Sequence, residues 1–149
     1  LSKKMKKLLY TSLILVHLLL SAEELTGWEK IIQHEEDEGK LTSLPTISVE
    51  VNAEKILVTV DNRTDSNLIY SGYGKDSPQI FTKRKENDEW IPSGWDWCGT
   101  GMKRYNLKKG KKVVFELRKA HEPTQFFTIF TAEKDQKTFS RIKLYEQEG

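Results

Sequence analysis

The sequence predicts an all-β fold. A two-sheet antiparallel sandwich over residues 46–149 is preceded by a signal peptide (1–22) and by a short acidic helix with a linker (23–45). Short runs of alternating apolar and polar residues recur along 46–149, with Gly, Pro, Asn and Asp between them. No helical periodicity separates the runs, so the pattern favours antiparallel sheets over a parallel sheet with crossover helices.

The first 22 residues have the layout of a secretory signal peptide. Four lysines precede an apolar run over residues 8–20, and the small residues Ser21 and Ala22 stand before an acidic pair. A membrane-spanning helix needs about 20 apolar residues, so this run is too short for a permanent anchor. We therefore expect cleavage near Ala22 and an extracytoplasmic protein, periplasmic or secreted. It would touch the membrane only through the leader before cleavage.

The charge of the chain changes when the leader is removed. The whole chain carries 24 Lys and Arg against 22 Asp and Glu. Removal of the four leader lysines leaves 20 basic residues and a formal charge of −2. Nucleic-acid binding requires a broad positive field, so nucleic acid is not an expected partner. Cys98 is the single cysteine, and stability must therefore come from the packing of one core rather than from an intramolecular disulfide.

A short helix over residues 27–38 is expected after the leader. Thr26 followed by Glu29 is a capping-box signature at its start. Acidic residues fill positions 35–38 at its end, where the helix dipole disfavours negative charge. We therefore expect a weakly docked segment, joined to the sandwich by a linker over residues 40–45.

The predicted strands follow one another closely. Ile47, Val49 and Val51 alternate with polar residues, and the pattern continues over residues 56–60, so these two runs predict a hairpin. Gly72, Gly74 and Pro78 punctuate the chain after the third strand, and residues 92–101 form the longest expected loop. The further strands are expected at residues 68–73, 80–85, 90–91, 103–107, 112–118, 125–131 and 138–145.

Two stretches resemble known families. The strand that ends at Val60, with Asn62 after it, and the later residues 107–117 (LKKGKKVVFEL) look like the closing strands of immunoglobulin-like and fibronectin-like bacterial domains. Residues 94–101 (GWDWCGTG) are similar to a Trp-Cys-Gly-x-Gly loop in uncharacterised small secreted bacterial proteins. The resemblance covers residues 46–145. It implies an immunoglobulin-like sandwich and brings no known activity with it.

Two expected loops, residues 72–78 and 92–101, are the best places for contacts with a partner, because a rigid sandwich presents its loops to solvent. In an extended segment the rings of residues 95 and 97 share one face. Packed inward, they plug the end of the sandwich; facing outward, they form a platform on which a sugar can stack. The candidate contact residues are Tyr73, Trp95, Asp96, Trp97, Cys98 and Thr100.

Catalytic and metal chemistry finds little support in the sequence. His34, Cys98, Met102 and His121 match the ligand types of a blue-copper site, but no His lies between Cys98 and Met102, as the usual copper loop requires. A nucleophilic Cys98 needs a base, and nothing in the sequence brings His121 to it. We therefore expect no enzymatic activity, no metal and no cofactor. The sequence predicts a binding module for an unknown protein or glycan partner, with a carbohydrate-binding or protease-inhibitor-like sandwich as the alternative.

Overall fold

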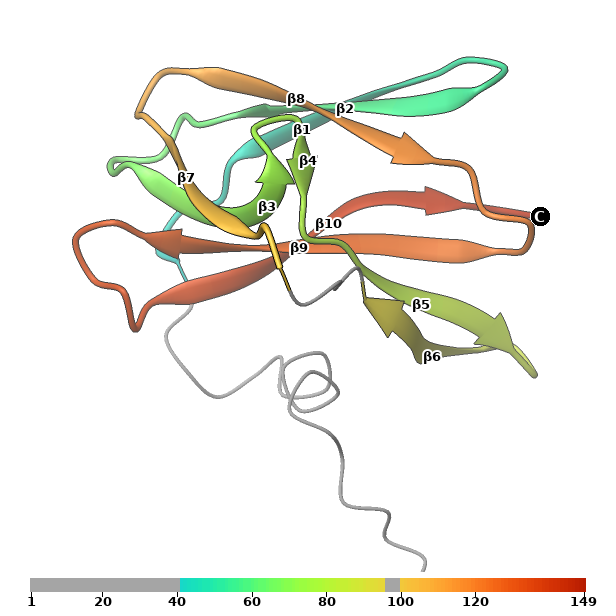
Figure 1. Cartoon of the computed structure of the whole chain (residues 1–149). Helices are drawn as coiled ribbons and strands as arrows, with labels where there is room; N and C mark the ends of the chain where they lie inside the picture. The colour runs from blue at the N-terminus through green and yellow to red at the C-terminus, as the bar shows by residue number, and fades with distance from the viewer. Residues whose placement is uncertain (1–40, 96–99) are drawn as a thin grey trace, which may run out of the picture. The chain divides into compact units, whose positions relative to one another are not determined.

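The computed structural model describes residues 41–95 and 100–149, and this part of the chain consists of strands, turns and bends without a helix (Figure 1). It accordingly holds no helix long and apolar enough to cross a membrane. The predicted signal peptide and acidic helix lie outside the described residues. The strands are β1 (Thr46–Val51), β2 (Lys55–Asp61), β3 (Leu68–Gly74), β4 (Ser77–Pro78), β5 (Phe81–Glu86), β6 (Glu89–Trp95), β7 (Lys103–Leu107), β8 (Lys112–Arg118), β9 (Thr124–Ala132) and β10 (Phe139–Gln147).

The smaller sheet has the strand order β1-β2-β8, and both pairings are antiparallel. Its first two strands form the predicted hairpin, which is thereby confirmed. β2 alternates strictly between buried and half-buried residues, and β8 between buried and exposed ones, as expected of strands with one face on a core. The register places Val58 opposite both Val49 and Phe115, so apolar side chains from all three strands share the inner face.

The larger sheet is organised around β9, its longest interior strand. β10 pairs with β9 along one side, while β3 and β5 share the other side. β5 pairs with β6 in a hairpin whose two turn residues, Asn87 and Asp88, have positive φ. β3 pairs with β7 along its first part and with the short β4 near its end. The strands predicted at residues 80–85, 90–91, 125–131 and 138–145 are confirmed as β5, β6, β9 and β10.

The inner faces of the two sheets enclose the core, with the smaller sheet above the larger one in Figure 1. At its centre the ring of Tyr70 lies 5.1 Å from that of Phe115 and 5.7 Å from that of Phe130, both edge to face. Such pairs add about 0.5–1.5 kcal/mol each to the burial of their area. The buried apolar residues around them include Ile56, Val58, Val60, Leu68, Leu107, Val113, Leu117, Ile142 and Leu144.

Asn62 joins the two sheets where the chain crosses between them. This side chain is 0% exposed, and its Nδ2 donates to the carbonyl oxygens of Ser66 (3.0 Å) and Leu107 (2.8 Å). Its Oδ1 accepts from the backbone N–H and the hydroxyl of Thr64. Its own backbone carbonyl accepts from Gly110 N–H at 2.7 Å. One buried amide therefore fixes the β2–β3 loop and the end of β7 together.

The outer face of the larger sheet also contains buried aromatic side chains. Phe127 pairs with Phe81 across β9 and β5, on the face opposite the core, and both are nearly fully buried. The ammonium group of Lys83 lies 5.5 Å from the ring centre of Phe127, and the guanidinium carbon of Arg141 lies 4.7 Å from it. Burial lowers the pKa of Arg141 to about 10 and also lowers that of Lys83. Cations over an aromatic face thus help to cover these rings.

Two details differ from the sequence prediction. The expected loop over residues 92–101 begins too early, because β6 continues through Pro92 to Trp95. Proline is tolerated there because β6 is an edge strand, and a bulge between Thr82 and Lys83 interrupts the pairing beside it. The stretch 72–78, expected as a loop, contains the end of β3 and the short strand β4.

We predict that Asn62→Ala lowers the free energy of unfolding by about 2–4 kcal/mol, because it leaves buried backbone groups without partners. Denaturant titration measures the loss. Asn106→Ala is the matched control, since Asn106 is exposed and bonds only the exposed Glu133 side chain among the described contacts. That variant should lose less than about 1 kcal/mol. Equal losses in the two variants would contradict the role assigned to Asn62.

Candidate binding cleft

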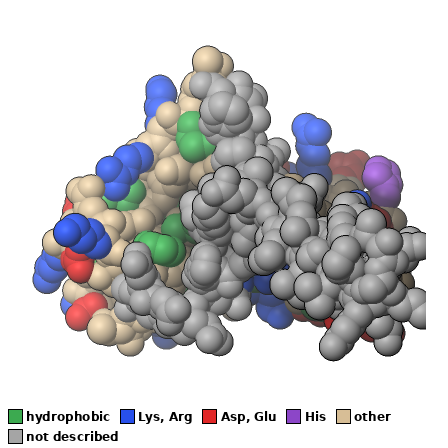
Figure 2. All heavy atoms as spheres, turned by 90° about the horizontal axis from the view of Figure 1, so that it is seen from below, with side chains coloured by type: hydrophobic (Ala, Val, Ile, Leu, Met, Phe, Trp, Pro, Cys, Tyr) green, Lys and Arg blue, Asp and Glu red, His purple; other side chains and the backbone are tan. Residues whose placement is uncertain are grey.

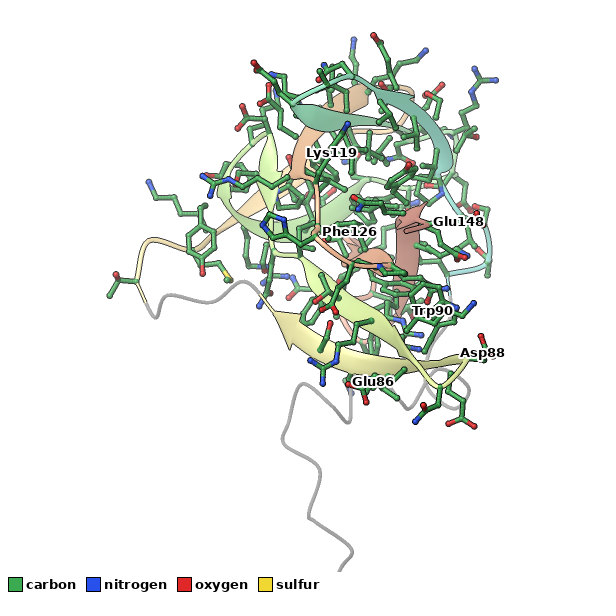
Figure 3. All side chains as sticks on the ribbon, turned by 90° about the vertical axis from the view of Figure 1, so that its right-hand side faces the viewer. Glu86, Asp88, Trp90, Lys119, Phe126 and Glu148 are labelled. Carbon is green, nitrogen blue, oxygen red and sulfur yellow. The ribbon has the colours of Figure 1, made fainter. Side chains whose placement is uncertain are left out.

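A cleft of about 500 Å³ opens between the two sheets at the edge formed by β4, β5 and β8. We call it the edge cleft. Figure 3 looks at this end of the domain, with Phe126 lying between the smaller sheet above and the β5–β6 hairpin, which carries Trp90, below. The residues that line the edge cleft are Ser77, Pro78, Ile80, Thr82, Glu116, Leu117, Arg118 and Phe126.

At Ser77 the edge cleft adjoins the turn between β3 and β4. The carbonyl oxygen of Asp76 accepts from Glu116 N–H at 3.1 Å, which ties this turn to β8. The buried hydroxyl of Tyr70 donates to the carbonyl oxygen of Lys75 at 2.5 Å. After Ser77 the chain runs through β4 into β5, while β8 continues to Arg118. The edge cleft is the space between these two segments.

Gly72 allows β4 to lie against β3. A Cβ atom at this position would sit 2.4 Å from the carbonyl oxygen of Ser77 and 2.9 Å from the Cα of Pro78. Both are backbone atoms, which cannot move aside as a flexible side chain can. Any side chain at residue 72 would therefore push β4 away and change the rim of the edge cleft.

The floor of the edge cleft is apolar and its rim is polar. Ile80, Leu117 and Phe126 are at most 9% exposed and belong to the core, so they form a rigid floor. Glu116 and Arg118 of β8 also line the cleft, with their side chains on the other face of the strand from Leu117: the Glu116 carboxylate bonds the ammonium group of Lys55 at 2.8 Å, and Arg118 is exposed. An apolar floor beside a few charged groups is the usual composition of a binding site. An arginine in this position can also hold a carboxylate through two hydrogen bonds.

Tyr70 remains a hydrogen-bond donor to the turn between β3 and β4 across the physiological pH range. Burial, with smaller contributions from Tyr105 and Asp76, raises the pKa of Tyr70 from 10.0 to about 12. The ring of Tyr70 also stacks on that of Tyr105 with 5.6 Å between their centres. The phenol thus stays neutral and keeps its bond to the turn carbonyl.

The contact residues predicted from the sequence are only partly described, and Tyr73 and Thr100 are not among the residues that line the edge cleft. Tyr73 is half-buried near the end of β3, and Thr100 is exposed just before β7. The pairing of Gly72 with Lys103 brings them to the same end of that strand pair. Trp95 ends β6 with its backbone opposite Phe81. Asp96, Trp97 and Cys98 lie outside the described residues, so the choice between an inward ring plug and a ring platform, and the expectation that Cys98 is not a nucleophile, remain untested.

The sequence did not reveal the edge cleft, because its residues come from strands far apart in the chain. The alternation over residues 112–118 predicts a strand that contains Leu117. This pattern does not indicate that one side of the Leu117 side chain faces a cleft. Elsewhere, on the described part of the face seen in Figure 2, apolar side chains surface only as small separate spots. The edge cleft therefore differs from that surface in bringing several apolar side chains together.

Neither a metal-binding cluster among the described residues nor a comparison with known proteins indicates a further site. In residues 41–95 and 100–149, no three His, Cys, Asp or Glu side chains are grouped so that they could hold a metal ion. His121 is exposed in the connection between β8 and β9. The chain matches no protein-family model, no curated protein and no solved structure. The candidate site consequently rests on the geometry of the chain itself.

We predict that stability falls as the pH rises from 10 to about 12, in part because of Tyr70. The unfolded chain releases this proton near pH 10, whereas the folded protein holds it to about pH 12, so unfolding becomes more favourable across that window. Denaturant midpoints measured at several pH values test this. Tyr70→Phe should make the decline shallower, and parallel curves for the variant and the wild type would contradict the assignment.

Proposed function

We propose that this chain is an exported, non-enzymatic binding module on an immunoglobulin-like β-sandwich, and that it holds a segment of a partner protein in the edge cleft. The observation that carries the proposal is the composition of this cleft. Its floor is built from core residues and its rim carries a carboxylate and a guanidinium group. An apolar side chain of the partner can contact Leu117 and Phe126 while an adjacent acidic group pairs with Arg118.

The fold and the leader support the rest of the proposal. Two antiparallel sheets around one core are compatible with an immunoglobulin-like arrangement, and such sandwiches present edges and loops on a rigid frame. The lysine-rich start and the apolar run over residues 8–20 are the features from which we infer export. A module of this kind requires no chemical step, only a surface that stays in place.

Binding in the edge cleft can be tested with displayed random dodecapeptides selected on the purified protein. We expect enriched peptides to carry an apolar residue next to an acidic one. Binding of the synthetic peptide to Arg118→Glu should be at least about tenfold weaker, or about 1.4 kcal/mol, because the charge on the rim is reversed. Fluorescence anisotropy of a labelled peptide measures this affinity.

Lys134→Glu is the matched control, because Lys134 is also exposed but lies in the turn between β9 and β10, among the residues of a different hollow. It makes the same change in net charge and should leave the affinity unchanged. The proposal fails if no peptide is enriched, or if the enriched peptides bind both variants as tightly as the wild type.

Export can be tested by expressing the full chain in a bacterial host and sequencing the N-terminus of the extracytoplasmic protein. We expect a mature chain that begins near Glu23. Leu15→Arg interrupts the apolar run and should keep the protein inside the cell, because the export machinery recognises an uninterrupted apolar segment. Recovery of intact residues 8–20 in a membrane pellet would instead identify an anchored protein.

A further inference from the structure

β1 is an edge strand whose only charged residue is Glu50, so it has little of the usual protection against pairing with another strand. In the described part of the chain, β1 pairs only with β2, through a regular register without a bulge. Its sequence, TISVEV, contains no lysine and no proline. The other edge strands carry these devices: β8 has Lys112 and Arg118, and β6 has Pro92 beside a bulge. Natural sheets protect exposed edges in this way because an unprotected edge pairs with other chains.

Apolar side chains of β1 are exposed although they lie on the inner face of the sheet. Val49 and Val51 stand opposite Val58 and Ile56, so they face the same side as the core. They are nevertheless 40% and 47% exposed, because β1 is the last strand of this sheet within residues 41–95 and 100–149. β1 thus offers a bare edge and an apolar flank at the same place.

The backbone of β1 is arranged for three further pairs of hydrogen bonds. Asn52 N–H bonds the Lys55 carbonyl at 3.1 Å and closes the β1–β2 hairpin. Because hydrogen-bonded pairs alternate in an antiparallel ladder, the residues of β1 that bond β2 are those at positions 46, 48 and 50. The N–H and C=O groups of Ile47, Val49 and Val51 therefore point away from β2, towards the free edge.

These features are self-complementary in one register. When two copies of β1 run antiparallel with Val49 opposite its own counterpart, Ile47 of each copy lies opposite Val51 of the other. The three residues whose backbone groups point outward are then the ones that form hydrogen-bonded pairs. Their side chains all lie on the inner face, and Ser48 faces Glu50 on the outer one. A shift by one residue would place inner side chains opposite outer ones, and a shift by two would pair only two of the three outward-pointing residues, so this register is favoured.

We propose that two copies of this chain associate through β1 in this register, so that the two small sheets form one continuous sheet around a twofold axis at Val49. The contact is isologous, with the same strand contributed by each copy. It covers the exposed valines and satisfies the outward backbone groups of β1. This association uses the edge opposite β8 in the smaller sheet, and it is independent of ligand binding in the edge cleft.

Sedimentation equilibrium of the purified protein between about 1 and about 500 µM tests the association. We expect dimers that increase with concentration. Val49→Lys should weaken self-association at least tenfold, because two ammonium groups would meet at the twofold axis. Val114→Lys is the matched control, since Val114 is 45% exposed on β8 of the same sheet and should leave self-association unchanged. Circular dichroism verifies that both variants fold.

The register is tested with Val49→Cys in a Cys98→Ser background, so that each chain carries one thiol. Residues of a hydrogen-bonded antiparallel pair have Cα atoms about 5.5 Å apart, within the range that a disulfide bridges. We expect a disulfide-linked dimer on mild oxidation, and none for Val114→Cys in the same background. Wild-type protein that stays monomeric throughout, or equal effects of the residue 49 and residue 114 variants, would overturn the proposal. An associating protein that fails to crosslink at residue 49 would overturn the register.

Discussion

The arrangement of the two sheets depends on the hydrogen bonds of the buried Asn62 side chain. The chain leaves the smaller sheet at the end of β2 and returns to it at the start of β8, and both crossings occur beside this side chain. Its Nδ2 donates to Leu107 at the end of β7, while its backbone bonds the turn at Gly110 and Lys111. A buried amide without hydrogen-bond partners costs free energy. If either crossing followed a different path, Asn62 would lose partners and the fold would be less stable.

A second constraint, the short strand β4, explains why the sandwich is open at one edge. Gly72 lets β4 approach β3, and the turn that follows β3 is held by hydrogen bonds from the Tyr70 hydroxyl and from the β8 backbone. The chain then enters β5, where it pairs with β9 rather than with β8. The space left between β5 and β8 exposes one side of the core as the floor of the edge cleft.

Much of the fold could be predicted from local patterns, because alternation and turn residues directly reflect a strand with one face on a core. The hairpin β1–β2 and the strands β5 and β8 all follow from a few adjacent residues. The edge cleft could not be predicted in this way. Its floor joins Ile80, Leu117 and Phe126 from three strands, and only the pairing of β5 with β9 brings them together. β4 was missed because two residues are too short for any pattern.

The two edges of the smaller sheet differ in chemistry, and this difference argues for different uses. β8 carries charged residues at both ends, and its edge is already engaged by the turn of β3–β4 through Glu116. β1 carries two exposed valines, and the backbone groups of Ile47, Val49 and Val51 point towards its outer edge. An edge with charged residues resists pairing, whereas a regular, apolar edge promotes it. Association through β1 would therefore leave the edge cleft beside β8 open on both copies, so that one dimer presents two clefts to a partner.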